Sequence, residues 1–369
     1  MNEIEPTGTK DRELTPPKIY KCEINHAGDR INISLWTAER ESATNDEGKA
    51  QFSSILIIPD IGESLISYEN GITRLTEAGY KVFGFDLEEL ISHTPSDKHG
   101  FFKKLCLEVI QVIAFIKKLD DGAPPIILSQ GLGSLVGLVN ARKHPTFVGG
   151  FVACSPMFQL VEKIKPLRRF VLKTLAEFTP SVIVPAGICP RFTRNRKVEK
   201  DDLIFKVSPK ITARQTYDYL KGMSQARRNF SKLSVPTLLI CPDNNIIHRY
   251  TFLKNAVPKH KNEKDISLVN LHTKYHAVAS DRSDHLDTYD TYIIPWLDQL
   301  KSKTKPSQSS SPKTEGAKTQ SVGKGEGESA VESSQSRKDS TPGGASPTLP
   351  GPSDTLDSSS ETSTEIHNS

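Results

Sequence analysis

One short stretch near the middle of the chain constrains the fold more than any other. Residues 126–134 read Ile-Ile-Leu-Ser-Gln-Gly-Leu-Gly-Ser. The β-branched apolar run at its start favours a buried strand. The small residues that end this run lead directly into a helical pattern. The stretch therefore predicts a strand that turns sharply into a helix at the top of a parallel sheet.

This strand–turn–helix unit has the backbone pattern of a nucleophile elbow, for which G-x-S-x-G is expected. In that register the alternate positions are Ser129, Gly131 and Gly133, so glycine holds the place of the nucleophile. Glycine adopts the strained φ of such a turn without a steric penalty. We therefore expect the turn to form while the nucleophilic hydroxyl is missing.

The two ends of the chain differ in composition from its centre. Residues 302–369 are rich in Ser, Thr, Pro, Gly, Glu and Lys and nearly lack large apolar side chains. This composition predicts a disordered tail, because such a segment buries too little surface to offset its ordering entropy. Residues 1–17 are polar, and we expect them to be flexible. Residues 18–301 are long enough for one domain with a single large core.

Charge and cysteine content exclude several classes of protein. The formal net charge of +4 over 369 residues gives no reason to expect nucleic-acid binding. No apolar run approaches the roughly 20 residues that span a bilayer, and the N-terminus lacks the features of a signal peptide. The cysteines have no C-x-x-C spacing, which favours reduced thiols in a cytoplasmic protein. They are Cys22, Cys106, Cys154, Cys189 and Cys241.

No cofactor is expected. The histidines His248, His272 and His285 have no metal-ligand partners at recognisable spacing, so we expect no metal site and assign them surface or packing roles.

Strands and helices alternate along the central domain, which predicts a mostly parallel sheet with helices on both faces. Besides the strand of the elbow, we expect strands at residues 20–24, 31–36, 54–58, 81–87, 148–154, 237–241 and 266–269. Helices are expected at residues 67–77, 101–119, 133–142 and 283–301, the last kinked at Pro295. The alternation breaks at residues 156–233. We expect this insertion to form a helical cap over the carboxyl ends of the strands.

Several sequence phrases resemble the α/β-hydrolase superfamily, in particular its monoacylglycerol lipase and lysophospholipase group, the serine aminopeptidase-like hydrolases. They are Ala-Gly-Tyr-Lys-Val at residues 78–82, the elbow, Ser-Pro at 155–156, Leu-Ser-Val-Pro-Thr-Leu-Leu-Ile at 233–240 and Tyr-His at 275–276. The resemblance covers residues 22–300. It implies an α/β-hydrolase fold and a lipid or acyl-ester ligand.

The resemblance also places the family's catalytic roles on particular residues. The nucleophilic serine falls on Gly131, the triad acid on Asn245 and the histidine base on His276. A neutral amide at position 245 cannot stabilise an imidazolium, and the equivalent change in a serine protease lowers the rate about 10⁴-fold. His276 alone retains the expected residue type.

The oxyanion motif is altered as well. The N–H groups at Ile61 and Leu132 hold the oxyanion-donor positions. The family's His-Gly before this loop reads Pro59-Asp60 here, and a carboxylate at this place opposes the stabilisation of a developing oxyanion. A Gly-His-Gly-x-Ser phrase is replaced by Glu-Glu-Leu-Ile-Ser at residues 88–92. These independent changes all predict a loss of catalysis.

We therefore expect a pseudo-hydrolase, which binds a lipid-like ligand or an unidentified protein partner without cleaving esters. The alternative is an active serine-type esterase or lipase for monoacylglycerol or lysophospholipid, with a relocated nucleophile. Ser129 and Ser134 are its candidate nucleophiles, His276 its base and Asp243 its substitute acid. A third hypothesis is a scaffold whose tail carries the interactions and whose pocket is filled by side chains.

The cap combines cations with apolar residues, a pattern that fits peripheral attachment to a membrane surface. In the relatives that the chain resembles, the cap docks on membranes. A solvated basic face is the simpler interpretation, so a cytoplasmic protein is expected in either case. The basic residues are Arg168, Arg169, Arg191, Arg194, Arg196 and Lys197, and their apolar neighbours are Phe170, Val171 and Leu172.

Overall fold

The computed structural model describes residues 16–26, 29–38, 54–61, 63–93, 100–161, 163–184, 211–244, 248–272, 277–280, 287–304 and 366–368. The chain divides into two compact units, Met1–Lys305 with Thr362–Ser369, and Pro306–Glu361. All the described residues belong to the first unit.

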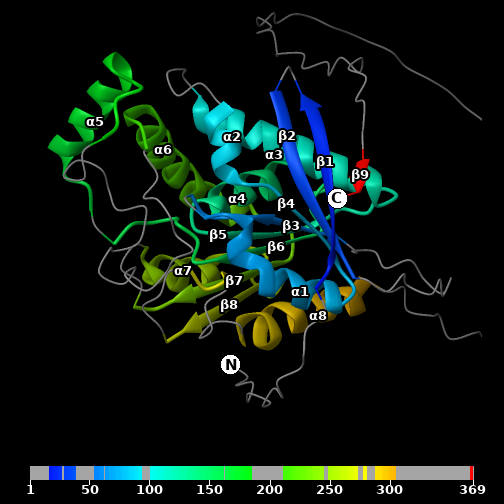
Figure 1. Cartoon of the computed structure of the whole chain (residues 1–369). Coiled ribbons are helices and arrows are strands. Elements are labelled where there is room, and N and C mark those ends of the chain that lie inside the picture. The colour runs from blue at the N-terminus through cyan, green and yellow to red at the C-terminus, as the bar shows by residue number, and fades with distance from the viewer. Residues whose placement is uncertain are drawn as a thin grey trace, which may run out of the picture. The chain divides into compact units, whose positions relative to one another are not determined.

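The first unit is built on one mostly parallel sheet. Its strands are β1 (Lys18–His26), β2 (Asp29–Thr37), β3 (Ser54–Ile58), β4 (Lys81–Gly84), β5 (Ile126–Gln130), β6 (Gly150–Cys154), β7 (Thr237–Pro242), β8 (Ile266–Leu271) and β9 (Ile366–Asn368). Within the described residues the strand order is β8-β7-β6-β5-β3-β4-β2-β1-β9 (Figure 1). The neighbouring strands β4, β3, β5, β6, β7 and β8 pair in parallel. The pairs β4–β2, β2–β1 and β1–β9 are antiparallel. The expected mostly parallel sheet is confirmed.

Helices cover both faces of this sheet. They are α1 (Glu69–Glu77), α2 (Leu87–His93), α3 (Phe101–Leu119), α4 (Gly133–Lys143), α5 (Pro166–Phe178), α6 (Ala213–Asn229), α7 (Tyr250–Ala256) and α8 (Ile294–Thr304). Short 3₁₀ turns connect some of them, and a π-helix at Tyr289–Ile293 leads into α8. None of the helices in the described ranges is long and apolar enough to cross a membrane.

The side chains of the central strands pack into two separate cores, because successive side chains of a strand point to opposite faces of the sheet. In β3, Leu56 and Ile58 pack in the core that also contains α3, α4 and α6. Ile55 and Ile57 belong to the other core, with residues of α1 and α8. Figure 1 shows α3 and α4 on one side of the sheet and α1 and α8 on the other. The run of apolar residues in β3 therefore reflects burial on both faces.

The strand predicted to extend to Leu87 is shorter in the structure, and this prediction was wrong. β4 ends at Gly84, which pairs with Ser34 of β2 and Ile57 of β3. Two residues later, the Asp86 carboxylate accepts the N–H of Leu65 at 2.9 Å, and its carbonyl accepts the N–H of Glu89. The chain is therefore already turning into α2, which pattern reasoning had missed.

Two helices of the expected cap lie within the described residues. α6 begins with a capping box, in which the Thr212 hydroxyl accepts the Gln215 N–H and the Gln215 side chain accepts the Thr212 N–H. It packs against α5, α3 and α4. Where Gly222 of α6 crosses Phe102 of α3, a Cβ would lie 3.0 Å from the ring. Residues 185–210 are not described, so Arg191, Arg194, Arg196 and Lys197 lie outside the described residues.

The last helix extends beyond its predicted end at residue 301. α8 ends at Thr304 and holds Pro295 in its first turn, directly after the π-helix. Near the end of the chain, β9 pairs with β1. Residues 305–365 lie outside the described residues, so their expected disorder stays a prediction.

Candidate functional site

The elbow forms between β5 and α4 with the sharp turn expected from its glycines. Gly131 has φ +53°, a conformation that favours glycine. At Gly133 a Cβ would lie 2.3 Å from the Pro59 carbonyl oxygen and 2.6 Å from that of Ile58. Because both contacts are to backbone atoms, only glycine allows α4 to approach the end of β3 this closely.

The carboxylate of Asp60 lies at the focus of this elbow. Its Oδ1 accepts the backbone N–H of Ile61 at 2.8 Å and the backbone N–H of Leu132 at 2.8 Å. The family resemblance assigns the oxyanion-donor positions to these same two residues. The Asp60 side chain is buried, with a relative exposure of 4%. Both N–H groups therefore point at one buried anion that the chain itself supplies.

The same carboxylate occupies the space that a side chain at position 131 would need. A Cβ built on Gly131 would lie 2.0 Å from Asp60 Oδ2 and 2.1 Å from its Cγ. Such separations are far below van der Waals contact, so one of the two groups would have to move. Asp60 and Gly131 are consequently coupled: the position of the carboxylate requires a residue without a side chain at the nucleophile position.

A second buried carboxylate, that of Glu63, is held next to the first. Gln130 Nε2 donates to Glu63 Oε1 at 2.8 Å and to Oε2 at 2.9 Å. The Tyr68 hydroxyl and the Asp60 N–H also donate to Oε2. Burial of Tyr68, and then the negative charge of Glu63, raise the pKa of the Tyr68 phenol well above its ordinary value. Tyr68 therefore stays protonated and acts as a donor.

Gln130 also connects the elbow by a hydrogen bond to the segment that follows position 276. Its Oε1 accepts the N–H of Ala279 at 2.8 Å, and the Ala279 carbonyl accepts the Tyr289 hydroxyl at 2.7 Å. Sequence reasoning had not assigned Gln130 any role. A signal was present, because Gln130 is a large amide at the end of a mostly apolar strand, directly before the turn.

Both serines considered as relocated nucleophiles are buried. The Ser129 hydroxyl donates to the Val152 carbonyl at 3.1 Å and lies 3.2 Å from the Ser134 hydroxyl. Their relative exposures are 1% and 0%. Both hydroxyls are thus hydrogen-bonded in the packing between β5, β6 and α4.

The candidate acid Asp243 pairs with a histidine that the sequence had not linked to it. Its Oδ2 lies 2.8 Å from Nδ1 of His272, whose side chain is 84% exposed. His272 does not take part in any other hydrogen bond among the described residues. Asn245 and His276 lie outside the described residues, so their assigned roles stay predictions.

No group of three or more His, Cys, Asp or Glu side chains that could hold a metal ion is found within the described ranges. The polar groups at the elbow are carboxylates, amides and hydroxyls, most of them already hydrogen-bonded to one another.

Comparisons with known proteins identify the family and the fold. The chain is 24% identical over 218 residues to a monoglyceride lipase homolog of monkeypox virus. The alignment covers 55% of this chain and 75% of the relative. The fold is similar to the monoacylglycerol lipase of Paleococcus ferrophilus (TM-score 0.52, 20% identity, 67% of this chain and 94% of that one). It is also similar to a soluble variant of the Saccharomyces cerevisiae monoglyceride lipase (TM-score 0.56, 17% identity, 80% and 99%).

The sequence model of one protein family matches residues 50–283. This match runs from β3 through the elbow and the cap to the segment after β8. The chain therefore belongs to the family described as serine aminopeptidase, S33, and has the α/β-hydrolase fold of the monoacylglycerol lipases that it resembles.

Proposed function

We propose that this protein is a catalytically inactive α/β-hydrolase, which binds a lipid-like ligand without cleaving an ester bond. The observation that carries the proposal is the position of the Asp60 carboxylate, which accepts the N–H groups of both Ile61 and Leu132. A hydrolase of this fold needs these donors for the oxyanion of its tetrahedral intermediate. Here an intramolecular anion takes them instead.

Electrostatics make the filled donor site incompatible with efficient ester cleavage. Two unit negative charges about 4 Å apart repel each other by about 4 kcal/mol at an effective dielectric constant of about 20. Loss of a single oxyanion donor already lowers kcat by roughly 10²- to 10³-fold. The carboxylate removes both donors and adds this repulsion. In addition, Gly131 has no group that could attack a carbonyl carbon.

The burial of the nearby serines favours this proposal over a relocated nucleophile. Ser129 and Ser134 are hydrogen-bonded inside the fold, and Ser155, at the end of β6, has a relative exposure of 0%. The pair of Asp243 and His272 supplies an acid and a base, but no described hydroxyl is hydrogen-bonded to that histidine.

A lipid-like ligand is supported by the relatives and by the surface of the cap. Two of the similar solved structures are named as a monoacylglycerol lipase and a monoglyceride lipase, and the second, from yeast, was solved with a substrate analogue. On α5, Leu167 is 72% exposed, Phe170 66% and Phe178 81%. Their spacing places these three side chains on one face of the helix. The exposed Lys165, Arg168, Arg169 and Lys173 accompany them, so we extend the proposal to peripheral contact with a membrane from the cytoplasmic side.

The first experiment tests whether any serine of the protein reacts. Purified full-length protein is incubated with a fluorophosphonate probe and assayed on p-nitrophenyl butyrate, a monoacylglycerol and a lysophospholipid. We expect neither labelling nor hydrolysis above that of buffer. Labelling that disappears when one serine is replaced would refute the proposal and favour the relocated nucleophile.

A second experiment tests the role of Asp60 directly. We compare Gly131→Ser/Asn245→Asp with the triple variant that also carries Asp60→Gly, using the same probe. The serine at position 131 should label at least about 100-fold faster in the triple variant, because only there is the carboxylate that competes for both donors absent. Equal labelling in both variants would show that Asp60 does not block the site.

A further inference from the structure

The cap contains a cavity that is separate from the filled elbow. Its volume is about 300 Å³, at the lower end of the range for small-molecule sites. It lies between α6, the first turn of α5 and the segment that joins β6 to α5. The lining residues are Gln159, Leu160, Lys163, Ile164, Arg169, Leu220, Met223, Ser224 and Arg227.

The lining has a polar part and an apolar part. Leu160, Leu220 and Met223 are buried, with relative exposures of 8%, 8% and 2%, and supply an apolar wall. Lys163, Arg169 and Arg227 supply three positive charges, and no Asp or Glu among the described residues lines the cavity. The cavity therefore combines an apolar wall with a cationic end.

Two of the cations that line the cavity, Arg169 and Arg227, repel each other. Arg227 is half-buried; its guanidinium donates to the Phe158 carbonyl and to the Ser224 hydroxyl, each at 3.3 Å. Burial, followed by the positive charges of Arg169 and Arg228, lowers the pKa of the Arg227 side chain. An anion bound between Arg169 and Arg227 would relieve this repulsion.

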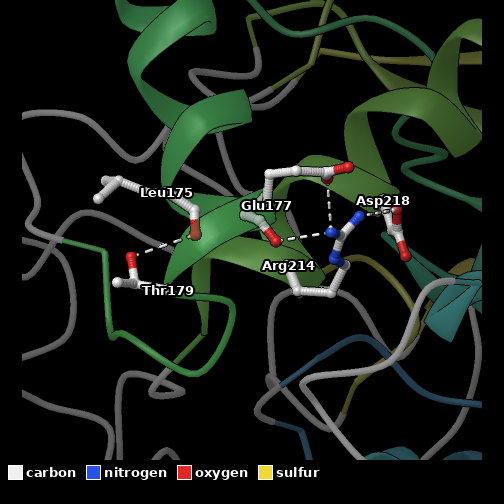
Figure 2. Close-up of polar contacts among 6 residues, drawn as sticks. Leu175, Glu177, Thr179, Arg214 and Asp218 are labelled. Carbon is white, nitrogen blue, oxygen red and sulfur yellow. Dashed lines mark hydrogen bonds and ion pairs between the residues drawn. The ribbon is translucent and has the colours of Figure 1, made fainter.

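The acidic residues of the two cap helices are engaged elsewhere. α5 contains one acid, Glu177, and α6 contains one, Asp218. Glu177 lies 2.8 Å and Asp218 3.9 Å from the guanidinium of Arg214. Figure 2 shows Arg214 between these two carboxylates. Arg214 is near the start of α6 and Glu177 near the end of α5, so the helices run antiparallel and the cavity lies at the opposite end of the pair.

We propose that this cavity binds an anionic amphiphile, a single hydrocarbon chain that ends in a phosphate monoester or a carboxylate. The headgroup contacts Arg169, Arg227 and Lys163, with the Ser224 hydroxyl as a further partner. The first carbons of the chain lie against Leu160, Leu220 and Met223. The inference rests on the proposed function, because it names the headgroup and the place of the lipid-like ligand.

The test measures binding by isothermal titration calorimetry with the full-length protein. Decyl phosphate and decanoate, each below its micelle concentration, are compared with neutral 1-decanoylglycerol and with inorganic phosphate. We expect at least one of the two anionic amphiphiles to bind more than tenfold tighter than both comparison compounds. The difference arises because charged hydrogen bonds and chain burial each add affinity. Equal affinity for 1-decanoylglycerol, or for inorganic phosphate, would overturn the proposal.

Variants locate the site. Arg169→Gln and Lys163→Gln each remove one exposed cation that lines the cavity, and we expect each to weaken binding roughly tenfold. Lys254→Gln is the matched control, because it removes the same charge from an exposed position of α7 that does not line the cavity. Equal affinities in all three variants would contradict the assignment.

Two further outcomes separate this inference from the proposed function. A protein that cleaves esters, but still binds decyl phosphate through Arg169, would refute the proposed function and support the cavity. A protein that cleaves no ester, but binds neutral and anionic amphiphiles equally, would refute the anionic headgroup and leave the inactive hydrolase standing.

Discussion

At the elbow, the Asp60 carboxylate accepts two backbone N–H groups, whereas at the cap cavity Lys163, Arg169 and Arg227 face a space that no described carboxylate lines. The elbow has the backbone of a catalytic site, but its donors are satisfied from within the chain. The cap cavity has unbalanced charge and free volume. Under the proposed function, the scaffold has lost the capacity for chemistry at the elbow and keeps a capacity for binding in the cap.

The largest effect that we predict tests whether the polar groups of the elbow depend on one another. Gln130→Leu removes two hydrogen bonds to the buried Glu63 carboxylate and the acceptor of the Ala279 N–H. We expect the free energy of unfolding to fall by about 3–5 kcal/mol, measured by urea denaturation. Gln159→Leu, at a half-buried position of the cap, is the matched control and should change it by less than about 1 kcal/mol. Similar losses of unfolding free energy in both variants would show that the elbow does not depend on its buried polar groups more than the cap does.

The next effect tests the coupling of Asp60 and Gly131. Gly131→Ser places a Cβ where the Asp60 carboxylate lies, at a residue with positive φ. We expect a loss of about 1–3 kcal/mol in the free energy of unfolding. The double variant Asp60→Gly/Gly131→Ser should be more stable than the sum of the single changes predicts, by at least about 1 kcal/mol. Additive single changes would show that the two positions are independent.

A smaller effect is expected on membrane binding by the exposed apolar surface of the cap. Phe170→Ser removes an aromatic side chain that is 66% exposed on α5, so we expect little change in stability. Binding to vesicles that contain anionic lipid should weaken by roughly fivefold to tenfold, because partial burial of a ring in the interface contributes about 1–1.5 kcal/mol. Ile66→Ser, an exposed apolar residue outside the cap, is the control for vesicle sedimentation. Unchanged vesicle binding by Phe170→Ser would argue against membrane contact through α5.

The smallest effect concerns the pair of Asp243 and His272, which belongs to neither region. The imidazole is mostly exposed, so solvent screens the pair. We expect Asp243→Asn to change the free energy of unfolding by less than about 1 kcal/mol, measured by urea denaturation. A loss as large as that of Gln130→Leu would mean that this pair, too, is part of a buried network.

Local patterns predicted most of the framework. The predicted helix at residues 101–119 and the predicted strand at residues 54–58 coincide with α3 and β3, because periodicity and runs of apolar residues are properties of neighbouring residues. The extent of β4 could not be predicted in this way. It ends at Gly84 because its pairing with β2 and β3 ends there, and pairing is a property of distant segments.

The sequence by itself determined that a strand would turn sharply into a helix at Gly131, and that this residue would lack a nucleophile. It also placed a carboxylate at Asp60. Only the tertiary structure decided where that carboxylate lies. β3 and β5 are neighbours in the sheet, which brings Asp60 to the N–H of Leu132 across 72 residues of chain. The same holds for the cap, where the packing of α5 against α6 decides which cations the acids neutralise. Strand order and helix packing set these contacts, and neither is encoded in a local pattern.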